Sequence, residues 1–314
     1  MVLLEETMEY LAPRGKDELM IDATMGEGNF SRAMLSRYPD LSVVGVDIDP
    51  AIQAVAREQL AEFGSRVQFV TGWAQDFFAA YPAALRRPNT VIADLGISLY
   101  HYQKSGRGFS FSADEPVDMR LDATSGFSAA ELLMRMSEKD IADTLYKNAG
   151  ERYSRRIARA IVQERRQGTA ATAAFSTAAL SELIQRAVPA SYRHGPIHPA
   201  TRTFMALRIE VNRELARLPE LLEGALDVLS PGGRLGVISF HSAEDRIVKD
   251  FFREKGKDCT CPPQAPVCVC SGRRKVNILT RKGVTAGEAE VKRNPPSRSA
   301  RLRVAEKIEE CDTP

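Results

Sequence analysis

Short apolar runs alternate with amphipathic stretches over the first hundred residues, which is typical of strands and helices in turn. Four runs have the length and the β-branched content of buried strands: "ELMIDAT" (18–24), "LSVVGVD" (41–47), "RVQFVTG" (66–72) and "NTVIADLG" (89–96). A helix is predicted from Pro50 to Phe63, because Asp49 is a good N-cap and proline is favoured at the first helical position. This alternation predicts a parallel sheet with right-handed crossovers.

The strand pattern stops after the first hundred residues and returns late in the chain. Residues 124–190 are rich in Ala, Arg and Glu with helical periodicity, and a further helix is expected from about Ala200. Three more strands are predicted: "GGRLGVISF" (232–240), "KVNILT" (275–280) and "ARLRVAEKI" (300–308). We therefore predict one Rossmann-like, doubly wound α/β domain built from residues 1–112 and 196–314, with an all-helical insert at 113–195.

Composition narrows the class of protein only a little. The 314 residues are 44% apolar and 27% charged with a net charge of +2, which is ordinary for a globular protein. The start, "MVLLEETMEYLAP", lacks a basic region, and no apolar run reaches about 18 residues, so we expect no signal peptide and no membrane span. The odd number of cysteines favours a reducing cytoplasm over a secreted disulfide framework. Four of the five cysteines are crowded together: Cys259, Cys261, Cys268 and Cys270. Their spacing differs from that of zinc knuckles and favours reduced thiols, with zinc binding as the alternative and no metal expected.

The stretch "LMIDATMGEGNFSRAM" (19–34) predicts a strand, a glycine loop and a helix. Gly26 and Gly28 allow backbone to approach a ligand closely. A dinucleotide fingerprint would need a glycine where Ser31 stands, and a phosphate-binding Walker loop would need a lysine. Asp47 ends the second predicted strand and is placed to accept two ribose hydroxyls. The loop and the acid together favour an adenosine site over a ligand-free turn.

Asp94 ends the fourth predicted strand, where ligands bind in open α/β sheets. Its carboxylate could bond an adenine amino group or the amine of a substrate, and the alternative is a helix cap. The pattern Asp22-x-x-x-Gly26-x-Gly28 resembles the loop of S-adenosylmethionine-dependent methyltransferases.

Four longer stretches are more specific: "GRGFSFSADEPVDMRLD" (106–122), "HPATRTFMALRIEVNREL" (198–215), "LSPGGRLGVISFHSAEDRIVKDFF" (229–252) and "NPPSRSARLRVAEK" (294–307). They resemble the bacterial 16S rRNA cytosine-N4 methyltransferases, the RsmH (MraW) family, and the resemblance runs nearly end to end. It implies a methyltransferase core with an inserted helical domain. It also implies methylation of one cytidine in the decoding region of 16S rRNA, at the exocyclic nitrogen.

The resemblance implies a site for S-adenosylmethionine made by Gly26, Gly28, Asn29, Phe30, Asp47, Trp73, Asp94 and His101. Three departures from the family pattern fall within it. Asn29 and Phe30 stand where the family usually has Gly and His, and His101 stands where it has a glutamine. A phenylalanine near the adenine is replaced by Ala74 or its neighbour Trp73, of which the indole is favoured.

We expect Asp94 to be the catalytic residue, holding the hydrogens of the cytosine amine. The base must leave its stack to be methylated, and Phe109 and Phe111 are candidate stacking surfaces, with Arg107 for a phosphate. The alternative for the two aromatic residues is the buried face of a strand.

The stretch "ERYSRRIARAIVQERR" (151–166) places four arginines on one helical face, Arg152, Arg155, Arg156 and Arg159, as candidate RNA contacts. A solvated surface is the alternative. His241 is expected near substrate, while Ser242 is predicted as the N-cap of the next helix with Asp245 as its partner.

The expected partner is 16S rRNA, alone or within the small ribosomal subunit, and the resemblance permits a homodimer. One alternative is another nucleic-acid or small-molecule methyltransferase on the same core. A second is an RNA-binding assembly factor of the same fold, with weak or no turnover. The substitutions at Asn29, Phe30 and His101 would favour it.

Overall fold

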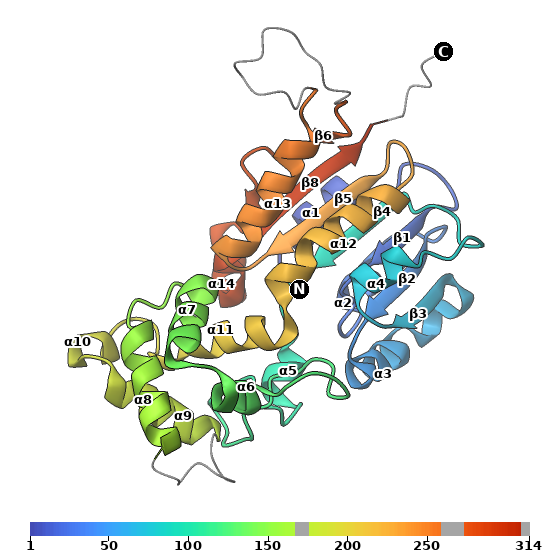
Figure 1. Ribbon diagram of the computed structural model, residues 1–314. Coiled ribbons are helices and arrows are strands. Elements are labelled where there is room, and N and C mark those ends of the chain that lie inside the picture. The colour runs from blue at the N-terminus through green and yellow to red at the C-terminus, as the bar shows by residue number, and fades with distance from the viewer. Residues whose placement is uncertain (167–175, 259–272, 309–314) are drawn as a thin grey trace, which may run out of the picture. The chain divides into compact units, whose positions relative to one another are not determined.

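The computed structural model describes residues 1–166, 176–258 and 273–308, and these form two compact units (Figure 1). One unit, Met1–Gly96 with Leu215–Pro314, carries the sheet and is called the α/β unit. The other, Ile97–Glu214, is called the helical unit. No helix within the described ranges is long and apolar enough to cross a membrane.

The α/β unit is built on one sheet with the strand order β3-β2-β1-β4-β5-β8-β6, and β7 pairs with β8. The strands are β1 (Leu19–Asp22), β2 (Ser42–Asp47), β3 (Val67–Thr71), β4 (Thr90–Asp94), β5 (Arg234–Ser239), β6 (Val276–Ile278), β7 (Val284–Thr285) and β8 (Arg301–Lys307). Strands β1 to β5 are parallel, whereas β8 runs antiparallel to β5 and β6. The order turns back at β1, which lies between β2 and β4, so the predicted doubly wound sheet is confirmed.

Helices cover both faces of this sheet, because alternate residues along its strands are apolar on each side. The helices of this unit are α1 (Leu4–Leu11), α2 (Asn29–Arg37), α3 (Pro50–Gln59), α4 (Ala74–Ala79), α12 (Glu214–Val228), α13 (Ser242–Lys255) and α14 (Glu288–Arg293). Ile21 belongs to the buried cluster that includes Leu222 of α12, while its neighbour Met20 belongs to the cluster that includes Met34 of α2. Every strand predicted from the sequence is present, trimmed at its ends.

Helix α3 confirms its predicted start but not its predicted end. Asp49 accepts a hydrogen bond from the Ala51 N–H at 3.0 Å, and Pro50 is the first helical residue. The α-helix ends at Gln59 instead of Phe63, because the chain tightens there into the 3-10 helix η1 (Ala61–Arg66). Gly64 adopts a positive φ of 53° inside that segment, a conformation that an α-helix excludes.

The helical unit contains α5 (Leu99–Gln103), α6 (Ala129–Arg135), α7 (Glu138–Ala149), α8 (Ser154–Arg166), α9 (Thr177–Ala187), α10 (Ala190–Arg193) and α11 (Ala200–Asn212). This unit includes more of the chain, Ile97–Glu214, than the segment 113–195 proposed from the sequence. One reason is that α11 packs on α6, α7 and α9. The Asn212 side chain also donates to the Met119 carbonyl at 2.8 Å and accepts from the Leu121 N–H at 2.8 Å. These buried contacts join α11 to a loop ninety residues earlier in the chain.

Candidate functional site

The loop after β1 has the backbone geometry that its glycines suggested. Gly26 and Gly28 have φ values of +55° and +78°, in the left-handed region that favours glycine. The Gly28 N–H donates to the Met25 carbonyl at 2.9 Å, and α2 begins at the next residue. A Cβ on Gly28 would lie 2.8 Å from Cδ1 of Leu60, so this position has no space for a side chain. The loop therefore brings bare backbone to the carboxyl end of β1.

Asn29 and Phe30 form the first turn of α2 and differ in exposure. Asn29 is exposed, with its Nδ2 3.5 Å from Oε2 of Glu27. Phe30 is partly buried and packs against the apolar cluster under that face of the sheet. Its ring thus contributes to the core, whatever else it contacts.

Asp47 is the last residue of β2 and ties together the loops that follow β1 and β2. Its Oδ2 accepts from the Gly26 N–H at 2.8 Å, and its Oδ1 accepts from the Asp49 N–H at 2.9 Å. The carboxylate is only partly buried. These two hydrogen bonds fix the orientation of the carboxylate at the carboxyl end of β2, next to the glycine loop.

Two further acids end the strands that flank the point where the sheet order turns back. Asp22 ends β1 and is 2% exposed, and its Oδ2 accepts from the Ser31 hydroxyl at 2.6 Å. Asp94 ends β4, and its N–H donates to Oγ1 of Thr24 at 2.7 Å. Burial raises the pKa of Asp22 to about 6, against the lowering effect of the Ser31 hydrogen bond.

Asp94 is the more perturbed of the two. Burial, followed by the nearby charge of Asp22 and then that of Glu244, raises the pKa of Asp94 to about 7. Part of the residue remains accessible, but its Oδ1 is buried and has no hydrogen-bond partner among the described residues. Buried polar atoms are rarely left without a partner, so an orphaned acceptor at the sheet's switch point fits a ligand that brings its own donor.

Trp73 follows β3 and is the N-cap residue of α4. The guanidinium carbon of Arg217, on α12, lies 4.0 Å from the centre of a Trp73 ring. Trp73 is partly exposed, whereas Ala74 is 6% exposed and faces the core, so the indole is the better placed of the two candidates to meet a ligand. Nothing in the local sequence pointed to Arg217, which lies far along the chain.

His101 lies within the helical unit, in the short helix α5. The ring is 5% exposed, with its centroid 5.4 Å from that of Phe109 and 5.8 Å from that of Tyr100, both edge-on. Ser98 caps this helix by accepting from the Tyr100 N–H at 3.0 Å. A histidine buried among aromatic rings here serves the packing of its own unit.

Arg107, Phe109 and Phe111 lie in a bent loop, so the buried-strand alternative for the two aromatic residues is wrong. Phe109 is 5% exposed, and Arg107 donates to the carbonyls of Arg120 and Leu121 at 2.9 and 3.0 Å. Phe111 is partly exposed and its ring stacks on His198 with centroids 4.6 Å apart. Phe111 is therefore the aromatic candidate that keeps an accessible surface.

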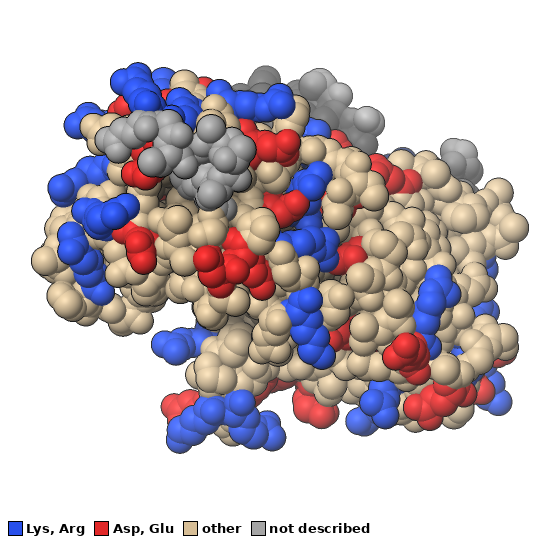
Figure 2. All heavy atoms as spheres, turned by 90° about the horizontal axis from the view of Figure 1, so that it is seen from below, with Lys and Arg blue, Asp and Glu red and all other residues tan. Residues whose placement is uncertain are grey.

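The arginine-rich stretch forms α8 with its charges outward. Arg155, Arg156 and Arg159 are exposed, while Ile157 and Ile161 are fully buried on the opposite face. Arg152 precedes the helix, which starts at Ser154, so its predicted place on the helical face is wrong. Arg159 lies 3.6 Å from a carboxylate oxygen of Glu138. Acidic and basic side chains are interspersed over the face drawn in Figure 2, as the small net charge suggests.

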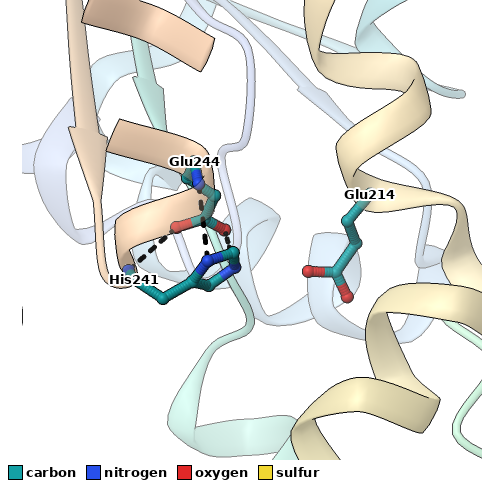
Figure 3. Close-up of side chains that lie close together, drawn as sticks. All are labelled: Glu214, His241 and Glu244. Atoms are coloured by element: carbon teal, nitrogen blue, oxygen red, sulfur yellow. Dashed lines mark hydrogen bonds and ion pairs between the residues drawn. The ribbon is translucent and has the colours of Figure 1, made fainter. Parts of the chain in front are cut away.

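His241, and not Ser242, is the N-cap of α13 (Figure 3). Its Nδ1 accepts from the Glu244 N–H at 3.4 Å, and Oε2 of Glu244 accepts from the N–H groups of His241 and Phe240 at 3.3 and 2.9 Å. The predicted partner Asp245 instead binds Arg303 of β8, at 2.6 and 3.1 Å. His241 and Glu244 thus form a capping box, in which each side chain accepts a hydrogen bond from the backbone of the other. It starts one residue earlier than predicted, because Glu244 is the acid that reaches the N–H groups after β5. The four clustered cysteines lie outside the described residues.

A doubly wound sheet with a glycine loop after β1 and acids ending β1, β2 and β4 defines an α/β protein of the nucleotide-cofactor-binding class. Comparison with known proteins is more specific. The chain matches the model of the MraW methylase family over residues 1–308, and it belongs to that family.

Several relatives of this chain are named ribosomal RNA small subunit methyltransferase H. The protein of that name from Treponema denticola is 55% identical over 98% of this chain and 96% of its own length. Those from Treponema pallidum and Heliobacterium mobile are 42% and 43% identical, over 98% of this chain and 92% and 98% of theirs. Among solved structures, an rRNA methylase from Streptococcus thermophilus aligns over 97% of this chain and 95% of its own with 11% identity and a TM-score of 0.42, a similarity too low to bear on the fold.

Proposed function

We propose that this protein transfers a methyl group from S-adenosylmethionine to the exocyclic N4 of a cytidine in the decoding region of 16S rRNA. The observation that carries the proposal is the match to a methylase family along residues 1–308, together with relatives named for small-subunit rRNA methylation. The orphaned Oδ1 of Asp94 offers a place for a ligand at the end of the sheet where such chemistry is expected.

In this proposal the α/β unit holds the methyl donor. The loop of Gly26 and Gly28 lies against it, the Asp47 carboxylate accepts hydrogen bonds from its ribose, and Trp73 offers an apolar face to the adenine. When bound, S-adenosylmethionine supplies a methyl group already activated by the positive sulfur. The residues of this chain then have to exclude water and align the acceptor nitrogen with that methyl.

The acceptor needs help because the lone pair of a cytosine amine is delocalised into the ring. Asp94 is proposed to accept a hydrogen bond from this amine, which favours the pyramidal nitrogen of the transition state. The amine must also lose one proton as its new bond forms. A carboxylate whose pKa is raised to about 7 is a good acceptor for that proton near neutral pH.

RNA recognition is proposed for the helical unit, with Arg155, Arg156 and Arg159 on α8 contacting phosphates and Phe111 meeting an unstacked base. The same proposal includes action in the cytoplasm on rRNA, free or within the small subunit. A role for His241 in touching substrate stays a prediction, because its Nδ1 and its N–H serve the start of α13. A homodimer, which sedimentation of the purified protein would detect, also stays a prediction.

The test is methyl transfer from labelled donor to 16S rRNA, offered naked and as the assembled small subunit, with the product nucleotide mapped by mass spectrometry. We expect label at one cytidine N4, and a loss of turnover on Asp94→Ala at saturating donor. Protein that binds the donor yet labels neither form of the RNA would overturn the proposed reaction. Full turnover by the Asp94→Ala variant would refute the role of Asp94 and leave the proposed reaction standing.

The second candidate is an RNA-binding assembly factor with little or no turnover. The departures at Asn29, Phe30 and His101 favour it, since Phe30 packs on the core of its unit and His101 is buried within the other. Calorimetry with S-adenosylmethionine or its demethylated product separates the two. A folded protein that binds RNA, but binds neither S-adenosylmethionine nor its demethylated product, would be the assembly factor.

A further inference from the structure

Helices α7 and α8 run side by side (Figure 1). A surface pocket lies between the middle of α7 and the start of α8. It is lined by Asp143 and Tyr146 of α7 with Ala142 behind them, and by residues 152–156 of the connection and the first turn of α8. Its volume is about 340 Å³, at the small end of the range for ligand sites and suited to a single nucleotide.

Three arginines give this pocket its charge. Arg152, Arg155 and Arg156 all line it and are exposed. Among the described residues the ion pairs on these two helices are Lys139 and Lys147 with Asp143, at 3.0 and 4.0 Å, and Arg159 with Glu138. The three pocket arginines join none of them, so their guanidinium groups keep donors for an anion.

The acidic groups nearby do not cancel this charge. Asp143 is held between the two lysines of its own helix, one turn to either side. The Lys139 hydrogen bond and charge, and then the charges of Lys147 and Arg155, lower the pKa of Asp143, so its one negative charge faces three cations. Glu151 is fully buried, where it accepts from the Tyr192 hydroxyl at 2.8 Å and from the Tyr153 N–H at 2.8 Å. The pocket therefore presents a net positive surface, which favours a phosphate.

An aromatic ring completes the pocket. Tyr146 is 64% exposed and lines the same pocket as the three arginines. Flat, accessible rings beside positive charge are the elements with which proteins bind single-stranded nucleic acids, because bases stack on the ring while phosphates meet the cations.

We propose that this pocket takes one nucleotide of single-stranded RNA, with its phosphate bound by Arg152, Arg155 and Arg156 and its base stacked on Tyr146. The inference rests on the proposed function, for which it names a further contact with the RNA substrate. Stacking and phosphate contacts carry no sequence code, so the pocket selects an unpaired strand and not a particular base.

The experiment measures binding of a short, fluorescently labelled single-stranded RNA to the full-length protein by anisotropy, at several salt concentrations. We expect the Arg155→Ala and Arg156→Ala variants to bind several-fold more weakly, and each to reduce the slope of log affinity against log salt by about 0.7. Arg186→Ala is the matched control, because Arg186 is an exposed arginine on α9 of the same unit. Arginine variants that match this control in affinity and slope would overturn the phosphate contact.

Tyr146 is tested by the Tyr146→Ala and Tyr146→Phe variants. The alanine variant should lose about tenfold in affinity, whereas the phenylalanine variant, which keeps a ring, should bind like wild type. Equal affinities for all three proteins would overturn stacking. Competition by inorganic phosphate as effective as by RNA, at equal phosphate concentration, would identify a free-phosphate site and overturn the RNA proposal, as would a duplex that binds as tightly as the single strand.

Methyl transfer and donor binding are measured on the same preparations, so that the two proposals fail separately. Protein that methylates rRNA while every pocket variant binds RNA normally refutes the pocket and leaves the reaction standing. Protein that never transfers a methyl group, but loses RNA with the arginine variants, refutes the reaction and leaves the pocket standing.

Discussion

Asp94→Asn should stabilise the ligand-free protein at alkaline pH relative to wild type, and much less at acid pH. The pKa of this carboxyl rises from its ordinary value of 3.8 to about 7 on folding, chiefly because the group is buried. A raised carboxyl pKa means that the folded protein favours the neutral form. Wild-type stability is therefore lost as pH rises between these two values, and asparagine has no such charge to bury.

The size of the effect follows from those two pKa values. One pKa unit corresponds to about 1.4 kcal/mol. Between pH 5 and pH 8.5 the free energy of unfolding of wild type should therefore fall by about 2–3 kcal/mol relative to that of the asparagine variant. The neighbouring charge of Asp22 acts in the same direction, since it raises the pKa of Asp94. Any constant cost of placing an amide at this site cancels when the two pH values are compared.

The assay is urea denaturation of both proteins at the two pH values, with Asp40→Asn as the control because Asp40 is an exposed aspartate on the same unit. The control should show no pH-dependent difference from wild type. If Asp94→Asn differs from wild type by the same free energy at both pH values, then Asp94 is solvated or paired in solution. Its proposed part in proton acceptance would lose its physical basis.

Three further predictions follow from the α/β unit. Gly28→Ala should cost about 2–4 kcal/mol of stability, since it combines a left-handed conformation with a clash. Gly150→Ala, in the same left-handed region but in open space, should cost about 1 kcal/mol in the same denaturation assay. Trp73 is the only tryptophan, so a donor titration should change the tryptophan emission, and heat released without such a change would place the adenosine elsewhere. Arg303→Ala should cost about 1–3 kcal/mol, because the partly exposed carboxylate of Asp245 then keeps only the longer ion pair with Arg301 at 3.8 Å, and removing both Arg303 and Asp245 should recover part of that loss, as thermal melts would show.

Much of the α/β unit could be predicted because its signals are local. Apolar runs of strand length predict β1 to β5. The neighbouring residues Asp49 and Pro50 are enough to predict where α3 starts. The end of α3 and the two-residue strand β7 were missed, since a tightened last turn and a short pairing with β8 leave no periodic pattern. The width of the helical unit depends on contacts such as those of Asn212, which join segments distant in the chain.

The candidate site was predictable in its backbone and less so in its side-chain environments. The positive φ values of Gly26 and Gly28 follow from their residue type. The Arg217 guanidinium over Trp73 and the burial of His101 among aromatic rings depend on folding and had no signal in the sequence. The cap of α13 was misplaced by one residue, because both Ser242 and His241 can accept a hydrogen bond there and only the reach of Glu244 decides between them.

The place of β8 in the sheet has a consequence for how the nascent chain reaches its native state. β5 pairs on one side with β4, which precedes it in the chain, and within the described residues its other side pairs with β8, the last strand in sequence order there. While the ribosome is still adding the residues between them, β5 presents an open row of N–H and C=O groups to its surroundings. The sheet can therefore be completed only late in synthesis, after β8 has been added. Chains released by translation that stalls before β8 should be prone to aggregate through the open edge of β5.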